Sequence, residues 1–381
     1  MNTEVFVVGG GPAGLAGAIA ARQRGFAVTL ADHSQASIDK ACGEGIMPEG
    51  VAALRSLEVE VPGEQSFPFR GIRFVENGWA AQASFAVSHG LGVRRTMLHR
   101  LLVERAQELG VTMHWGVNVT AGERGVHCNG ERVKCDWLIC ADGQRSQMRD
   151  WAALGPVTVR NQRIGIRQHF ITTSVTDFVE VHWHVQGQAY VTPVGSNEVC
   201  VVLIGNQPGV RLGELWGLFP ALQERLRNAQ PSDKARGSVS ATIRVGRITR
   251  GGNLALIGDA AGSIDAITGE GLSLAFRQAV TLGKALSCGN LTQYEATHRS
   301  LERAPRMMER VLLALASTHW LRRRALVALA ARPDTFTRLL AVHNGMLSLR
   351  SVGLRPLAAF ILQLLRAGKM DRAWDTGGGL A

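Results

Sequence analysis

The stretch Val5-Phe6-Val7-Val8-Gly9-Gly10-Gly11-Pro12-Ala13-Gly14 decides the fold. Its first four residues have the apolar composition of a buried strand, and the glycines at 9, 11 and 14 fit the pattern G-x-G-x-x-G. The first glycine permits a tight turn, the second lets the backbone approach a pyrophosphate, and the third lets a helix pack against the strand. An Ala-rich helix over 15–24 and a second strand over 26–31 follow, and that strand ends at Asp32. The unit therefore predicts a dinucleotide site in which the helix N-terminus faces the phosphates and Asp32 takes ribose hydroxyls.

Two later segments repeat the arrangement of a strand that ends in glycine and carboxylate. Residues 137–141 form an apolar strand that runs into an A-D-G-x-x-S-x-x-R pattern over 141–149. Residues 254–257 form another, followed by Gly258-Asp259 and then by Thr268-Gly269-Glu270-Gly271 before a helix over 272–286. Strand ends of this kind hold an extended ligand at the carboxyl edge of a sheet. The N-terminus of the second helix favours an anionic ring, and reduced flavin is such a ring.

These three motifs, in this order over residues 1–290, resemble the FAD-dependent oxidoreductases with the para-hydroxybenzoate hydroxylase fold. That group includes aromatic hydroxylases, flavin halogenases and geranylgeranyl reductase-like proteins. The resemblance implies an α/β fold: a Rossmann-like FAD-binding domain of the GR2 type, an inserted antiparallel β-sheet domain for substrate, and a C-terminal helical region. The expected boundaries are 1–70, 94–160 and 245–290 for the FAD-binding domain, 71–93 and 161–244 for the substrate domain, and 291–381 for the helical region.

The resemblance also implies which residues bind FAD. Gly269 and Gly271 would lie beside the isoalloxazine, and the segment with Asp142 would serve both FAD and NAD(P)H, the expected reductant. Arg95 matches an arginine that contacts FAD in the family, although it could also be a solvated residue at a helix start. The full set of expected cofactor contacts is Gly9, Gly11, Pro12, Ala13, Gly14, Asp32, Arg95, Asp142, Gly143, Gly258, Asp259, Gly262, Thr268, Gly269 and Gly271.

The segment Lys40-Ala41-Cys42-Gly43-Glu44-Gly45 looks like the Cys-Gly-rich segment of geranylgeranyl reductase-like members, whose cysteine lies near the flavin. Cys42 and Glu44 are therefore the candidate catalytic residues, with an ordinary buried cysteine as the alternative for Cys42. Halogenases usually carry a W-x-W-x-I-P signature and a lysine near an early insertion. Residues 181–185 have a different pattern, and residues 71–90 contain no lysine. These departures argue against halogenation.

The expected activity is that of an NAD(P)H-dependent monooxygenase of secondary metabolism. It would hydroxylate a hydrophobic or aromatic small molecule through a flavin C4a-hydroperoxide. One alternative is a geranylgeranyl reductase-like reduction of a carbon–carbon double bond. An alternative of another class is a non-catalytic flavin-binding or membrane-associated partner protein. The substrate's identity and the oligomeric state have no signal in the sequence.

The middle of the chain reads as an antiparallel sheet, with strands over 163–172, 178–185, 188–194 and 198–204 and a helix over 212–228. By resemblance this sheet roofs the substrate cavity. The candidate substrate contacts are Arg167, His169, Trp183, Tyr190 and Pro193. Glu180, His182 and His184 share one strand face, which suits a polar surface or a cavity lining. Without a third convergent segment they predict no metal site.

The net charge of +11 is concentrated in the tail. Residues 299–381 hold 14 Lys and Arg against five Asp and Glu, and from Tyr294 onward the pattern is helical, with breaks expected at Pro305, Pro333, Gly345, Gly353 and Pro356. Two interpretations stay open. The tail packs on the body with arginine stems over apolar surface, or it forms an interface for a lipophilic substrate or an anionic membrane.

Other classes are excluded by composition. With 46% hydrophobic and 19% charged residues the chain is not intrinsically disordered, and no aromatic platform or motif for nucleic acid is present. The six cysteines form no C-x-x-C pair, and neither a signal peptide nor a spanning apolar stretch is evident. The sequence predicts a cytoplasmic protein with reduced thiols, with peripheral membrane contact as an alternative.

Overall fold

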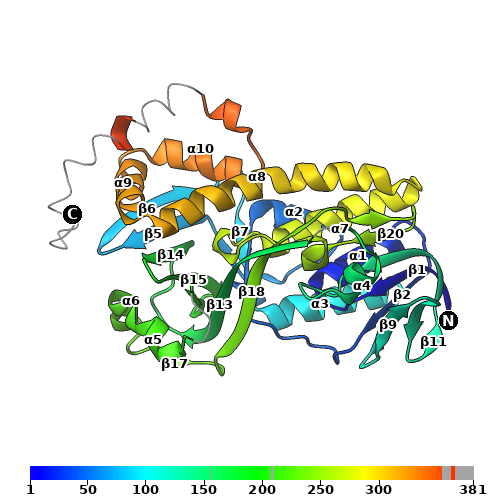
Figure 1. The fold of residues 1–381 in the computed structure, drawn as a ribbon. Helices are drawn as coiled ribbons and strands as arrows, with labels where there is room; N and C mark the ends of the chain where they lie inside the picture. Colours follow the sequence, from blue (N-terminus) through cyan, green and yellow to red (C-terminus); the bar gives the residue numbers. More distant parts are fainter. Residues whose placement is uncertain (156, 207–209, 354–361, 365–381) are drawn as a thin grey trace.

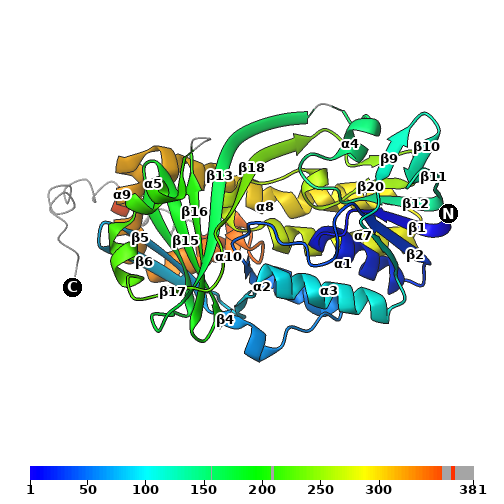
Figure 2. The ribbon, with the colours of Figure 1, turned by 90° about the horizontal axis from the view of Figure 1, so that it is seen from below.

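The computed structural model describes residues 1–155, 157–206, 210–353 and 362–364. Figures 1 and 2 show a six-stranded sheet near the N-terminus, an eight-stranded sheet at the other end of the molecule, and long helices across both. The predicted fold class, a Rossmann-like domain with an inserted sheet and a C-terminal helical region, is confirmed.

The six-stranded sheet has the order β19-β20-β12-β1-β2-β8 and carries the N-terminal motif. Its strands are β1 (Asn2–Val8), β2 (Val28–Asp32), β8 (Thr112–Trp115), β12 (Lys134–Cys140), β20 (Leu254–Leu256) and the antiparallel edge strand β19 (Thr249–Arg250). Helices α1 (Pro12–Arg22), α3 (Arg95–Glu108) and α7 (Gly271–Ser287) pack together along this sheet. A small sheet of β9 (Val119–Gly122), β10 (Gly125–Cys128) and β11 (Glu131–Arg132) adds Val126 and Cys128 to the same core. The parallel strands are covered on both faces, which explains the unbroken apolar run of β1.

The eight-stranded sheet has the order β17-β13-β16-β15-β14-β5-β6, and β18 also pairs with β13. Its strands are β5 (Gly71–Glu76), β6 (Trp79–Ser84), β13 (Val157–Ile171), β14 (Phe178–His184), β15 (Gly187–Gly195), β16 (Glu198–Gly205), β17 (Gln230–Pro231) and β18 (Arg236–Val245). All neighbours are antiparallel except β14 and β5, which run parallel. The long pair β13 and β18 reaches from this sheet toward the six-stranded sheet (Figure 2).

Shorter elements connect the sheets. Strands β3 (Gly45–Ile46), β4 (Phe67–Phe69) and β7 (Gly90–Gly92) form a third sheet beside α2 (Pro48–Ser56) and η1 (Gly63–Gln65). The remaining short helices are α4 (Gln147–Trp151), η2 (Gly258–Ala261), η3 (Ala266–Thr268) and η4 (Leu349–Val352). The helix expected over 212–228 is two helices, α5 (Leu212–Gly217) and α6 (Pro220–Arg225). Pro220 separates them because it has no N–H to continue the first helix and is favoured at the first position of the second.

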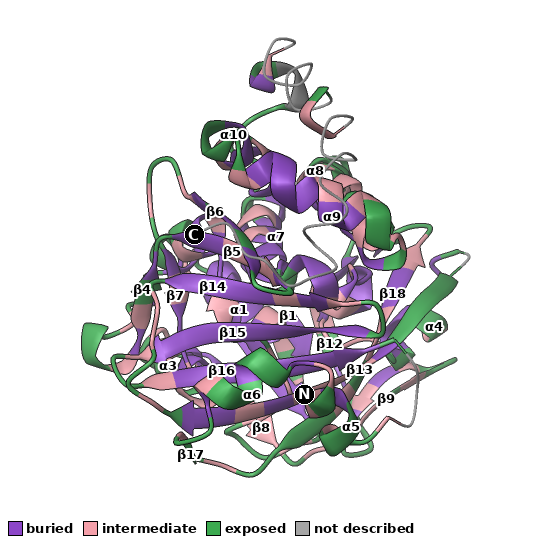
Figure 3. Cartoon of the chain, turned by 90° about the vertical axis from the view of Figure 1, so that its left-hand side faces the viewer, coloured by how far each residue is buried: buried purple, intermediate pink, exposed green. Residues whose placement is uncertain are grey.

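The C-terminal helices are α8 (Leu291–Ser317), α9 (His319–Ala330) and α10 (Pro333–His343). Helix α8 continues through Pro305, so the break expected there is wrong; one missing N–H is tolerated inside 27 packed residues. Pro333 does begin α10, and Gly345 follows it with φ of 74°. Helix α8 packs on α7 and α9, while α9 and α10 pack on β6 (Figures 1 and 3). Pro356 lies outside the described residues.

Part of the basic tail is buried. The Arg322 side chain is 2% exposed and donates to Glu76 of β5 from Nε at 2.9 Å and to the carbonyl of Leu315 at 3.0 Å. Arg323 is also buried. Arg322 therefore stabilises the docking of α9 on the eight-stranded sheet, as the packing interpretation expects. No described helix combines the length and apolar character that a membrane span requires.

Candidate functional site

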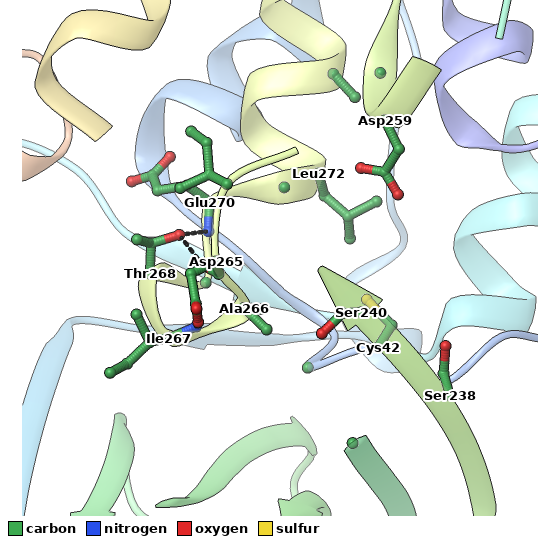
Figure 4. Close-up of a pocket in the computed structure, with 18 of the residues that line it drawn as sticks. Cys42, Ser238, Ser240, Asp259, Asp265, Ala266, Ile267, Thr268, Glu270 and Leu272 are labelled. Carbon is green, nitrogen blue, oxygen red and sulfur yellow. Dashed lines mark hydrogen bonds between the residues drawn. The ribbon is translucent and has the colours of Figure 1, made fainter. Parts of the chain in front are cut away.

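A cavity of about 1260 Å³ runs from the glycine turn of β1 to the C-terminal helices. It exceeds the size of an ordinary small-ligand pocket, which is roughly 300–1,000 Å³. Cys42, Asp259 and Leu272 come from three separate segments and lie around the same space (Figure 4). The cavity therefore has room for an extended ligand along the sheet edge and a second molecule beyond it.

The glycine turn forms one end of the cavity. Gly9 has φ of 107°, and a Cβ there would lie 2.4 Å from the carbonyl oxygen of Ala141. A Cβ on Gly14 would lie 1.8 Å from the carbonyl oxygen of Gly9, so both positions need glycine for packing. A Cβ on Gly11 would meet no protein atom within 4 Å, and Gly11 lines the cavity. Helix α1 has no side-chain cap at its N-terminus, which leaves its first N–H groups available to phosphate.

Asp32 lies beside this turn at the end of β2. Its carboxylate accepts hydrogen bonds from the N–H of Gly10 and the N–H of Ser34, each at 2.6 Å. These contacts hold the carboxylate on the cavity wall, where a ribose could reach it. Gly9, Gly11, Pro12, Ala13 and Asp32 all line the cavity, and Gly14 packs directly behind them.

The later motifs line the next section of the cavity. The wall includes Arg95, Asp142, Gly143, Gly258, Asp259, Thr268, Gly269 and Gly271. Asp142 accepts from Ser146 Oγ at 2.5 Å and from the N–H of Met148 at 3.1 Å, so it also caps the turn into α4. Like Gly14, Gly262 is an expected cofactor contact that does not line the cavity. It lies off the cavity wall, with φ of 124°, and a Cβ there would lie 3.0 Å from the carbonyl oxygen of Ile243.

Cys42 and Glu44, the two candidate catalytic residues, differ in their hydrogen bonds and in their burial. Cys42 lines the cavity and accepts a weak hydrogen bond from the N–H of Glu44 to Sγ at 3.4 Å. Glu44 also lines the cavity, and its side chain is fully buried, although the residue has φ of 57°, a conformation that is costly outside glycine. Its carboxylate accepts from the N–H of Arg95 at 2.9 Å, from Arg167 Nη1 at 3.2 Å and from His169 Nε2 at 2.6 Å.

Arg167 and His169 were expected to contact substrate; they belong to this buried network and do not line the cavity. Asp233 accepts from His169 Nδ1 at 2.8 Å, and Asp39 accepts from Arg167 Nη1 at 2.8 Å. Burial disfavours the charged form of His169, but its hydrogen bonds to Glu44 and Asp233 outweigh that effect and raise its pKa. The carboxylates that hold these side chains come from distant loops, which strand alternation alone does not place.

The network also contains Cys200, whose Sγ lies within 4.8 Å of the nearest ligand atoms of Glu44 and His169. Three such atoms can bind a metal ion. Here the Arg167 guanidinium already contacts Glu44, and both ring nitrogens of His169 face carboxylates. Burial raises the pKa of the Cys200 thiol well above its usual value, so the thiolate that a metal prefers is disfavoured. The cluster is therefore an ion-paired network that fixes the Cys42 segment.

Of the other three candidate substrate residues, one lines the cavity and two do not. Tyr190 lines the cavity and donates to the carbonyl of Ile267 at 2.8 Å. Trp183 and Pro193, which were also expected to contact substrate, do not line the cavity. Trp183 packs edge-on against Phe74 with ring centroids 5.6 Å apart, and Phe74 separates it from the cavity.

Glu180 and His182 lie on the face of β14 away from the cavity. Glu180 Oε2 accepts from Arg225 Nη1 of α6 at 2.6 Å and from His182 Nε2 at 3.1 Å. Burial opposes ionisation of Glu180, but the hydrogen bonds from His182 and Arg225 lower its pKa to about 2. This face is covered by α6 and is neither a solvated surface nor a cavity lining.

The far section of the cavity is apolar. The sheet was expected to roof a substrate cavity, but the residues that line this section were not named from the sequence. Strands β5, β14 and β16 supply Ile72, Phe74, Val179, Val181, Val202 and Ile204. The C-terminal helices supply Met307, Met308, Val311, Leu312, Leu315, Leu321, Ala325, Leu329, Phe336, Leu339, Leu340 and His343. The apolar spacing along 308–315 could have identified this face of α8, but it does not show which ligand or sheet the face meets.

Two buried polar groups lie where α10 meets the Thr268–Gly271 loop. His343 Nε2 is 3.2 Å from the carbonyl oxygen of Thr268 and 3.4 Å from Glu270 Oε1. Burial, together with the charge of Glu49, raises the pKa of Glu270 to about 8, and burial lowers the pKa of His343 to about 4. Burial thus favours the neutral forms of both side chains.

Comparison with known proteins identifies the family. The FAD binding domain model matches residues 2–293. The chain belongs to this family of FAD-binding proteins. It is an FAD-dependent oxidoreductase with the para-hydroxybenzoate hydroxylase fold, and the open cradle at Gly11 with the uncapped start of α1 fits the pyrophosphate of FAD.

Several relatives share much of the chain. A menaquinone reductase of Mycolicibacterium smegmatis is 27% identical, over 99% of this chain and 97% of that protein. A digeranylgeranylglycerophospholipid reductase of Methanopyrus kandleri is 28% identical, over 72% of this chain and 78% of its own length. Among solved structures, a flavin-dependent brominase matches with a TM-score of 0.74 at 15% identity, covering 98% of this chain and all of that one. The tetrameric form of 2-methyl-3-hydroxypyridine-5-carboxylic acid oxygenase matches with a TM-score of 0.67 at 22% identity, covering 94% and 98%.

Proposed function

We propose that this oxidoreductase uses NAD(P)H to reduce a carbon–carbon double bond in a lipophilic small molecule. The observation that carries the proposal is the apolar section of the cavity, which continues directly from the wall of cofactor motifs and is closed by α8, α9 and α10. The menaquinone reductase and the digeranylgeranylglycerophospholipid reductase each match over more than 70% of this chain and of their own length. Their names support a reductase. We therefore put the reductase, the second choice from the sequence, first, and keep the monooxygenase as the second candidate.

The residues of the first cavity section would hold FAD. The backbone at Gly11 and the first N–H groups of α1 would donate hydrogen bonds to the pyrophosphate. The Asp32 carboxylate would accept hydrogen bonds from the adenosine ribose. Asp259 would accept hydroxyls of the ribityl chain, and the N-terminus of α7 at Gly271 would face the ring. When bound, FAD supplies hydride-transfer chemistry that no side chain of the site offers.

The apolar walls of the far section would hold the lipophilic substrate and exclude water from it. Tyr190, Thr192, Ser238 and Ser240 are polar residues on the sheet side. Burial raises the pKa of Tyr190 far above its usual value, so its hydroxyl stays protonated and bonded to Ile267. Cys42 lies at the junction of the two sections. Glu44 would act by fixing the positions of Cys42 and Arg95, since its N–H donates to Cys42 Sγ and its buried carboxylate accepts from the N–H of Arg95.

The overall reaction adds two hydrogens to the double bond. NAD(P)H is oxidised to NAD(P)⁺ and gives the hydride, and the second hydrogen arrives as a proton from solvent. The test is turnover of the FAD-loaded protein with NAD(P)H and a menaquinone or a geranylgeranyl lipid under strict anoxia, with products weighed by mass spectrometry. We expect a product heavier by two hydrogens; absence of anaerobic product with both substrates would overturn the proposal.

The same measurement, repeated in air, tests the monooxygenase as the second candidate. The observation in its favour is the apolar lining of the far cavity section, which would keep water away from an oxygen-transferring cofactor. A product that forms only in air and carries one added oxygen atom would establish this activity instead. A bound flavin that NAD(P)H does not bleach with any substrate would support a non-catalytic role.

A further inference from the structure

The apolar end of the cavity reaches the surface beside α8. Three residues both line the cavity and are exposed there: Val239 of β18, which is 54% exposed, Val311 of α8, which is 46% exposed, and Ala314. A residue that is part of the wall and also meets solvent marks the mouth of a cavity. The large apolar interior therefore opens through an apolar rim.

Helix α8 carries positive charge on the same face. Five residues of α8 lie on one side of the helix, because they follow the spacing i, i+4, i+7, i+8 and i+11. They are Arg303, Met307, Arg310, Val311 and Ala314. Met307, Val311 and Ala314 line the cavity, and Arg303 and Arg310 are exposed. Within the described part of the chain neither arginine has an acidic partner, because the acids of this helix segment bond elsewhere: Glu302 to Arg306, and Glu309 to Arg244.

The corner between α8 and α9 adds an exposed aromatic ring. Trp320 is 58% exposed, with the guanidinium of Arg324 5.2 Å from its ring centroid. The next residue, Leu321, lines the cavity. An exposed tryptophan beside arginines and aliphatic side chains is typical of surfaces that sit at the headgroup level of a bilayer.

We propose that this surface, the mouth patch of Val239, Arg303, Arg310, Val311, Ala314 and Trp320, docks on an anionic lipid bilayer. The positive charge selects an anionic surface, and the apolar rim with the tryptophan enters the headgroup region. Docking in this orientation applies the cavity mouth to the membrane, so a lipophilic substrate moves from bilayer to cavity without crossing water. The inference rests on the proposed function only for the nature of that substrate, and vesicle binding is measured without turnover.

The experiment is co-sedimentation of the FAD-loaded full chain with phosphatidylcholine vesicles, with and without phosphatidylglycerol. We expect binding only with phosphatidylglycerol, and weaker binding at high salt. The double variant Arg303→Gln/Arg310→Gln should lose roughly fivefold in affinity for each arginine. Trp320→Ser should weaken binding as well, because it removes the aromatic anchor.

A matched control separates the patch from general stickiness. Ile171 is an exposed apolar residue, 39% exposed, that pairs with β17 at the opposite edge of the eight-stranded sheet from β6 and α9. Ile171→Ser should bind vesicles as the wild type does, and all variants should keep their flavin absorbance and melting temperature. Wild-type protein that stays in the supernatant with phosphatidylglycerol vesicles, or a double arginine variant that binds as tightly as the wild type, would overturn the proposal. Wild-type protein that binds the vesicles but shows no reductase activity would count against the proposed function alone.

Discussion

Gly11 is a glycine whose missing side chain serves the ligand and not the fold. Its φ of −70° suits any residue, and a Cβ would meet no protein atom within 4 Å. Gly11→Ala should therefore fold normally, while the added methyl group occupies the path of the FAD pyrophosphate. We expect at least about tenfold weaker FAD binding, roughly 1.4 kcal/mol, measured by titration of the apoprotein with FAD.

Gly63 provides the matched control, because a Cβ there also meets nothing within 4 Å and the residue does not line the cavity. Gly63→Ala should bind FAD as the wild type does. Equal FAD affinity for both variants would show that the pyrophosphate does not pass Gly11.

His169 gives the protein a pH dependence of stability with a defined sign. Its pKa is raised in the fold above the ordinary value of 6.5, because its contacts with Glu44 and Asp233 outweigh burial. A raised pKa means that the folded state binds the proton more tightly than the unfolded state. The added stability is complete below pH 6.5 and is lost as the pH rises through the folded pKa.

This prediction is checked with urea unfolding of the wild type and of His169→Gln at a series of pH values. The wild-type free energy of unfolding should fall relative to that of the variant between pH 6.5 and the raised pKa. The penalty of the substitution should be largest in acid, at about 3 kcal/mol for a broken buried ion pair. A difference that stays constant with pH would mean that the pKa of His169 is the same in the folded and unfolded states.

Local sequence spacing was enough to place those residues whose position depends only on the turn that contains them. The glycine motif, Asp32 and Asp259 line the cavity where the strand ends place them, because parallel strands bring their carboxyl ends to one edge. Alternation on β13 put Arg167 and His169 on a common face, but the carboxylates that draw them into the core sit on loops at Asp39 and Asp233. Such long-range partners leave no periodic signal.

At the scale of elements, α10 shows what the tail contributes. Phe336 is 4% exposed, its ring centroid lies 5.2 Å from that of Phe74 on β5, and both residues line the cavity. Phe336→Ala removes a side chain that both anchors α10 and shapes the cavity. We expect a loss of about 3 kcal/mol in the free energy of unfolding and a higher KM for a lipophilic substrate, with unchanged FAD affinity.

Val342→Ala is the control on the same helix, since Val342 is 1% exposed and does not line the cavity. It should lower stability while leaving KM unchanged. A Phe336→Ala variant with wild-type KM would show that substrate does not reach the helices.

Element type was predictable where composition was decisive, and helix ends were not. Pro220 splits a segment expected to be one helix, whereas Pro305 lies inside an unbroken α8. The difference comes from packing. Helix α8 is held along its length by α7, α9 and the loop before η3, and this tertiary support outweighs the hydrogen bond that Pro305 cannot donate.

At the scale of the molecule, α8 joins the flavin-binding part to the eight-stranded sheet. Glu309 of α8 is 1% exposed, and its Oε1 accepts from Thr242 Oγ1 of β18 at 3.1 Å and from the N–H of Asp265 at 2.8 Å. Its Oε2 pairs with Arg244 Nη2 at 3.1 Å. One buried carboxylate thus connects a helix, a strand of the eight-stranded sheet and the loop that leads to the Thr268–Gly271 wall of the cavity.

We therefore expect the whole protein to unfold in a single transition in which flavin release and loss of the sheet coincide. Glu309→Gln removes the charge that Arg244 faces, and it should destabilise the protein by about 3 kcal/mol and separate the two events, with flavin released at the lower temperature. Calorimetry run beside flavin fluorescence measures both. Glu295→Gln is the control, because Glu295 bonds Thr249 of β19 and Arg299 and so ties α8 only to the six-stranded sheet. That variant should keep the two events together; if wild-type protein released flavin well below its unfolding transition, α8 would not be the link between the two parts.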